Sequence, residues 1–159
     1  MKKSFLLLIL FIYLAGCSNP TLSLPEMDQH KLLITHVKEP LLTVIDLKKQ
    51  EVIQEETLPF TVQSFAKMAQ KLVMANKGAQ EVLTLDLATG KIRPLTSAIS
   101  SITDLWYDQE EKMLYMTDAG SDELLIFDPA RGKITKRIKV GKYPQAISLH
   151  KPFLYILNG

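Results

Sequence analysis

The sequence repeats with a period of about 40 residues, and this feature constrains the fold more than any other. The clearest landmark is an apolar segment that begins with leucine and ends on a polar residue. Its four copies start at Leu32, Leu72, Leu114 and Leu154. The starts are 40, 42 and 40 residues apart. A fixed period of this length is typical of a chain built from copies of one supersecondary unit.

Two further landmarks recur in step with the first. One is an aspartate that closes an apolar segment: Asp46, Asp86 and Asp128. The other is a segment that starts 16 residues after each aspartate: Val62, Ile102 and Pro144. Because three independent landmarks share one period, the repeat covers the chain from residue 31 onward.

Each repeat is predicted to form four short strands. In the third repeat we expect strands at 113–117, 123–128, 133–140 and 145–149, which are rich in β-branched and aromatic residues and are separated by turn-forming residues. Four strands in a 40-residue unit predict an all-β fold, a β-propeller with one four-stranded blade per repeat. We place the repeats near 31–70, 71–111 and 112–152, with the start of a fourth at 153.

About three blades are therefore present, whereas a closed ring typically needs four to eight. We expect a partial ring, a truncated product or fragment of a longer propeller. An open arc leaves strand edges unpaired and blade faces exposed. We therefore also expect that 31–159 alone does not form a stable monomer.

The third repeat carries a family resemblance. The stretch "LYMTDAGSDELLIFDPARGKITKRIKVGKYPQAISL", residues 114–149, resembles the YVTN-type β-propeller repeat. The shared features are a tyrosine-containing strand, a small-residue turn, a strand ending in Asp, a Gly-Lys turn, and Val-Gly followed by Pro. The second repeat keeps "LDLATGKI" but lacks Val-Gly-x-x-Pro, and the first has Lys48, Lys49 and Gln50 in place of the glycine turn. The resemblance implies a propeller over 31–159.

The N-terminus predicts export. Residues 1–16 have the layout of a secretory signal peptide, with a basic start, an apolar run at 5–14 and small residues after it. This run is shorter than the roughly 20 apolar residues that span a bilayer. The single cysteine, Cys17, follows Leu-Ala-Gly, which resembles the lipobox of bacterial lipoproteins. The resemblance implies cleavage before Cys17 and acyl chains such as palmitate on it. We expect a membrane anchor in the bacterial cell envelope, outside the cytoplasm, with 17–30 as a tether.

Charge and motifs exclude several function classes. Without Lys2 and Lys3 the 19 basic residues become 17, which balance 17 acidic ones. The mature chain is then neutral, and no basic run is present, so we expect no nucleic-acid partner. No nucleophile elbow, phosphate loop or cysteine cluster occurs. The topology places His36 and His150 on opposite faces, so we expect no metal site, and we expect no cofactor.

The same topology predicts a candidate ligand face. Loops after the second strand of each blade share one face with the loop at 140–144. Our candidates on this face are His36, Asn76, Asp118, Lys142 and Tyr143. The other reading is that they are solvated loop residues. For Asp46, Asp86 and Asp128, each four residues before Gln50, Gly90 or Gly132, we favour a turn role over a metal site, with glycine supplying a positive φ.

Two function classes remain open. The first is a non-catalytic binding or scaffold module for an unknown protein or small molecule. The second is part of a lactonase-like or other propeller enzyme whose active site needs further blades. The expected inner-strand segments 62–66, 102–106 and 144–148 contain a single carboxylate, Asp104. This paucity of acidic groups favours the binding module.

Overall fold

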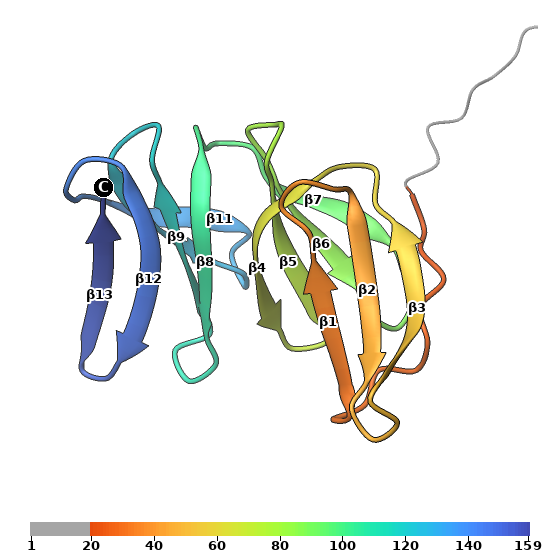
Figure 1. Ribbon diagram of the computed structural model, residues 1–159. Coiled ribbons are helices and arrows are strands. Elements are labelled where there is room, and N and C mark those ends of the chain that lie inside the picture. Colours follow the sequence, from red (N-terminus) through yellow and green to blue (C-terminus); the bar gives the residue numbers. More distant parts are fainter. Residues whose placement is uncertain (1–19) are drawn as a thin grey trace, which may run out of the picture.

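The computed structural model describes residues 20–159, which form thirteen β-strands and no helix (Figure 1). Within this range no helix is long and apolar enough to cross a membrane. Cys17 and the predicted signal peptide lie outside the described residues. The strands form four antiparallel sheets arranged in an arc, and β13 lies at the opposite end of the arc from β3.

The four sheets follow one another along the chain. Sheet 1 consists of β1 (Lys31–Thr35), β2 (Leu41–Asp46) and β3 (Glu51–Thr57). Sheet 2 consists of β4 (Val62–Met68), β5 (Lys71–Asn76), β6 (Val82–Asp86) and β7 (Ile92–Thr96). Sheet 3 consists of β8 (Ile102–Asp108), β9 (Met113–Asp118), β10 (Glu123–Asp128) and β11 (Lys133–Lys139). Sheet 4 consists of β12 (Pro144–His150) and β13 (Phe153–Asn158).

The sheets are out of phase with the sequence repeats by one strand. The last strand of each repeat pairs with the first strand of the next repeat: β4 with β5, β8 with β9 and β12 with β13. Tight connections cause this pairing. Met68 lies opposite Lys71 across two turn residues, and Ala69 there has a φ of 53°. So short a loop can only return the chain antiparallel beside itself.

The recurring aspartates have the predicted turn role. In Asp46, Asp86 and Asp128, one carboxylate oxygen accepts hydrogen bonds from the backbone N–H groups two and three residues later, at 2.9 to 3.2 Å. The residue after that has a positive φ in each case: 56° at Gln50, 67° at Gly90 and 63° at Gly132. Asp108 makes the same pair of bonds in the turn after β8, which the sequence analysis missed.

The core lies between neighbouring sheets. One apolar cluster joins sheets 2 and 3 and includes Val73, Leu114 and Phe127 without measurable exposure. A second joins sheets 1 and 2 through Leu42 and Leu85, both fully buried. Each sheet therefore depends on its neighbour for burial, as in stacked repeats.

The segment 20–30 is not a free tether, which corrects that expectation for these residues. We call it the N-terminal strap. Leu22 is only 8% exposed and packs in the core between sheets 1 and 2. Its N–H donates to Gly90 O at 2.8 Å, and Ile92 N donates to Pro20 O at 3.2 Å. Figure 1 shows the strap in orange along the outer side of β3. The apolar side chain of Leu22 favours docking over solvation.

Gly90 is required by the docked strap. A Cβ at this position would lie 1.7 Å from Leu22 O, whereas a Cβ at Gly132, in the matching turn of sheet 3, would meet nothing within 4 Å. Both glycines have φ near 65°, so alanine strains either backbone by roughly 1 kcal/mol. We expect Gly90→Ala to cost about 2 kcal/mol more than Gly132→Ala in urea unfolding, because burial of Leu22 is lost. Equal losses would contradict docking of the strap at Gly90.

Candidate ligand-binding face

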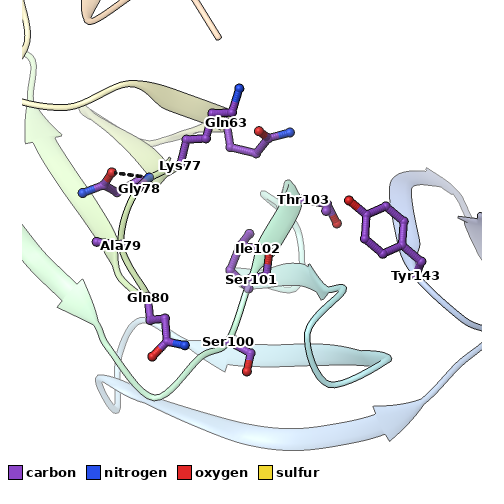
Figure 2. A pocket seen from close by; sticks show the side chains of 11 residues that line it. Gln63, Lys77, Gly78, Ala79, Gln80, Ser100, Ser101, Ile102, Thr103 and Tyr143 are labelled. Atoms are coloured by element: carbon purple, nitrogen blue, oxygen red, sulfur yellow. Dashed lines mark hydrogen bonds between the residues drawn. The ribbon is translucent and has the colours of Figure 1, made fainter. Parts of the chain in front are cut away.

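The predicted ligand face carries a pocket of about 380 Å³. Its walls are the loop 76–80 after β5, the residues 100–103 at the start of β8, and Tyr143 in the loop before β12. Figure 2 shows Tyr143 across the pocket from the 77–80 loop, with its hydroxyl end toward Thr103. These loops lie along the upper edge of Figure 1. The volume is in the range of small-molecule sites, which is about 300–1,000 Å³.

Two of the five candidate residues line this pocket, namely Asn76 and Tyr143. The other three do not. The His36 ring nitrogen Nε2 lies 3.1 Å from Thr43 Oγ1, in sheet 1. Lys142 is adjacent to Tyr143, but its ammonium is bound to Asp122 Oδ2 at 2.6 Å.

The carboxylate of Asp118 is occupied by the protein itself. Asp118 is 1% exposed and accepts hydrogen bonds from the backbone N–H groups of Ser100, Ser101 and Gly120, at 2.8, 2.7 and 3.1 Å. Asn76 Oδ1 accepts the corresponding bond from Gly78 N at 3.0 Å. The sequence signal for this turn is an Asx residue two positions before glycine. Asp118 therefore supports the pocket wall, since its carboxylate holds Ser100 and Ser101 in place.

A β-bulge occurs at the same position in each of the three inner strands. The register shifts at the second residue of β4, β8 and β12, and the bulged residues are Gln63, Thr103 and Gln145. Bulges redirect a side chain and are frequent beside functional sites. Gln63 and Thr103 line the pocket. The Thr103 hydroxyl donates to Pro144 O at 2.6 Å, which links the pocket floor to the Tyr143 loop.

Tyr143 is held in an uncommon backbone conformation. Its φ is 48°, and its N–H donates to Asp122 Oδ1 at 2.9 Å. Asp122 itself has a φ of 54°. The hydrogen bond from Lys142 and the one from Tyr143 N lower the pKa of Asp122, and Asp122 in turn raises the pKa of Lys142. Non-glycine residues with positive φ cluster at functional sites, and Tyr143 lines the pocket.

The inner-strand carboxylate Asp104 is also committed to structure. Its Oδ1 accepts from the Ser64 hydroxyl at 2.7 Å and from Leu105 N at 2.9 Å, and its Oδ2 accepts from Ile147 N at 2.8 Å. These contacts join β4, β8 and β12, the inner strands of three consecutive sheets. Across residues 20–159, no three His, Cys, Asp or Glu side chains are grouped so as to hold a metal ion.

Sequence reasoning missed most of the pocket lining. Gln63, Gln80, Ser100, Ser101 and Thr103 were not among the candidates. The available signal was the equivalent place of Gln63, Thr103 and Gln145 in the third landmark. The bulge that turns each side chain depends on strand pairing, so spacing alone did not reveal it.

Comparison with known proteins defines the fold. The chain matches no protein family and no curated protein sequence. Among solved structures it resembles a chain of the nidogen/laminin complex, with a TM-score of 0.68 and 16% identity over 81% of this chain. It also resembles Sqt1 of Saccharomyces cerevisiae (TM-score 0.63, 14% identity, 77% of this chain) and BamB of Moraxella catarrhalis (TM-score 0.61, 14% identity, 84% of this chain). The fold is a β-propeller.

The propeller is a partial ring. The match covers 51% of the nidogen/laminin chain, 35% of Sqt1 and 39% of BamB, so this chain spans between about a third and a half of their length. Two sheets are four-stranded blades, sheet 1 has three strands and sheet 4 has two. The expectation of four-stranded blades in an unclosed ring is confirmed. The pocket lies on the face of the propeller that carries the 76–80 loop and Tyr143, beside the inner strands β4 and β8. We call this face the loop face.

Proposed function

We propose that this chain is a non-catalytic binding module, a partial β-propeller anchored by lipid at Cys17 on the outer side of a bacterial membrane. One observation carries the binding role. The loop face has a pocket lined mainly by neutral polar side chains, while the inner-strand carboxylate nearest to it in sequence, Asp104, accepts three internal hydrogen bonds. A propeller hydrolase needs a free general acid or base within reach of its substrate.

The docked strap also supports a position for the propeller relative to the membrane. The strap is bound to sheet 2 from Pro20 onward. Three peptide units separate Pro20 from Cys17, a reach of at most about 11 Å. A lipid on Cys17 would therefore hold the strap side of sheets 1 and 2 close to the bilayer.

Replacing Cys17 by alanine tests the anchor. We expect the wild-type chain in the membrane fraction and Cys17→Ala in the soluble fraction or as an unprocessed precursor, because the thiol that carries the lipid is gone. Two or more acyl chains are needed for stable anchoring. Cell fractionation with intact-mass measurement is the readout. Unchanged membrane binding and mass in Cys17→Ala would contradict the lipoprotein proposal.

The same cells test the binding role. A photo-crosslinking residue at Gln80, which lines the pocket, should capture a ligand, whereas the same residue at Gln109, in the turn after β8 on the other face, should not. Both positions are exposed, so accessibility is matched. A mass-shifted adduct at position 80 alone supports the pocket as the binding site. Equal capture at both positions, or none at either, argues against it.

A further inference from the structure

We propose that the pocket beside Tyr143 binds an uncharged carbohydrate; this inference rests on the binding function above and names its ligand class. Five side chains in the pocket have a polar group that no residue in the range 20–159 pairs with. They are Gln63, Gln80, Ser100, Ser101 and Tyr143. Amides and hydroxyls both donate and accept hydrogen bonds. A sugar presents the complementary set, because each of its hydroxyls also donates and accepts.

The charged groups around the pocket are satisfied within the protein. Lys142 and Asp122 form an ion pair at 2.6 Å, and the carboxylate of Asp118 accepts three backbone hydrogen bonds. Glu81 Oε1 accepts from Asn76 Nδ2 at 2.9 Å. Lys77, the cation among the lining residues, donates to Val37 O at 3.2 Å. Lys77 and Glu81 form no ion pair within 20–159, but they carry opposite charges, so a charged ligand of either sign would meet a like charge and would lose its hydration on entry.

Tyr143 supplies the apolar surface that a sugar ring needs. Its side chain is 56% exposed although the backbone is held by Asp122 at 2.9 Å. A tyrosine has an apolar ring face and a polar tip, and its two χ angles make it inexpensive to immobilise. A pyranose likewise has C–H faces and a hydroxyl rim. Stacking on Tyr143 would therefore leave the rim directed at the amides and hydroxyls of the opposite wall.

An extended peptide fits the pocket less well. Peptides that add to a sheet need an unpaired strand edge. β4 and β8 are edge strands of their sheets, but a backbone donor of β8 is already occupied, because Leu105 N donates to Ser64 Oγ at 3.2 Å and to Asp104 Oδ1 at 2.9 Å. The flanking loops are also bonded, since Lys77 N donates to Thr61 O at 2.9 Å and Ala119 N donates to Ser101 O at 2.8 Å.

The test uses the full chain, solubilised in detergent, on arrays of uncharged oligosaccharides, acidic oligosaccharides and peptides. We expect binding to an uncharged oligosaccharide that falls roughly tenfold or more in Tyr143→Ala. Tyr155→Ala is the matched control, because Tyr155 is 55% exposed on β13 outside the pocket and should leave binding unchanged. Affinity for a neutral ligand should change little between about 0.05 and 0.5 M salt.

A pair of charge substitutions at Gln63 separates the ligand classes. Gln63→Glu and Gln63→Lys should both weaken an uncharged sugar, because each replaces an amide by a charge that must be desolvated. Tighter binding in either one would mean a charged ligand and overturn the carbohydrate proposal. Tyr143-dependent binding of peptides alone would overturn it while the binding function stands. No binding on any array, or binding that does not change in Tyr143→Ala, would overturn both the carbohydrate proposal and the proposed binding function of this pocket.

Discussion

Replacing Asp118 by alanine is expected to lower the free energy of unfolding by about 5 kcal/mol, because three backbone N–H groups lose a charged acceptor worth roughly 1.5–3 kcal/mol each. These groups are the N–H of Ser100, Ser101 and Gly120, at 2.7 to 3.1 Å from the carboxylate. Asp118 is 1% exposed, so water cannot replace it fully. Urea unfolding of the full chain measures the loss.

Asp118→Asn is the control for shape. Its remaining carbonyl oxygen can still accept from Ser101 and Gly120, while the amide NH₂ faces the N–H of Ser100. We expect a loss of about 2 kcal/mol, between the wild type and Asp118→Ala. A stable Asp118→Ala that no longer binds ligand would reverse this assignment and restore Asp118 as a ligand contact of the face.

Replacing Asp104 by alanine is expected to cost about 4 kcal/mol, since the Ser64 hydroxyl and the N–H groups of Leu105 and Ile147 lose their shared acceptor. Removing the carboxylate also breaks the hydrogen bonds that link sheet 3 to sheets 2 and 4, because Ser64 lies on β4 and Ile147 lies on β12. Unfolding in urea should therefore become less cooperative as well as shift to lower urea concentration.

Ser64→Ala provides the comparison for Asp104. It removes one of the three donors and leaves the carboxylate bonded to the other two, so we expect a loss of about 1 kcal/mol. Asp104 also separates the two function classes. If Asp104→Ala kept its stability and lost a hydrolytic activity that the wild type shows, the enzyme alternative would replace the binding module.

The repeat predicted the strands well. The strand expected at 123–128 is β10, and the one expected at 113–117 ends one residue later. The turn role of Asp86 was also predictable, because Asp, a small loop and Gly90 form a local unit whose hydrogen bonds involve neighbouring residues. Local rules of this kind depend on sequence spacing alone.

The site was predicted only in part. Topology placed Asn76 and Tyr143 on one face, and both line the pocket. Asp118 was on the same face by the same reasoning, but its side chain is bonded to Ser100 and Ser101, which precede it by 18 and 17 residues. Which polar side chain is free and which is occupied depends on such contacts. The sequence pattern does not show these contacts.

Periodicity and turn chemistry were sufficient for the all-β class and the blade count, because both arise from interactions within about ten residues. Two features arose from contacts between distant segments instead. The docking of the strap follows from the absence of a side chain at Gly90, against which Leu22 lies. The link between three sheets follows from Asp104, whose partners Ser64 and Ile147 are 40 and 43 residues away. Such contacts exist only once the blades have packed, since packing brings together groups that lie one repeat apart in the chain.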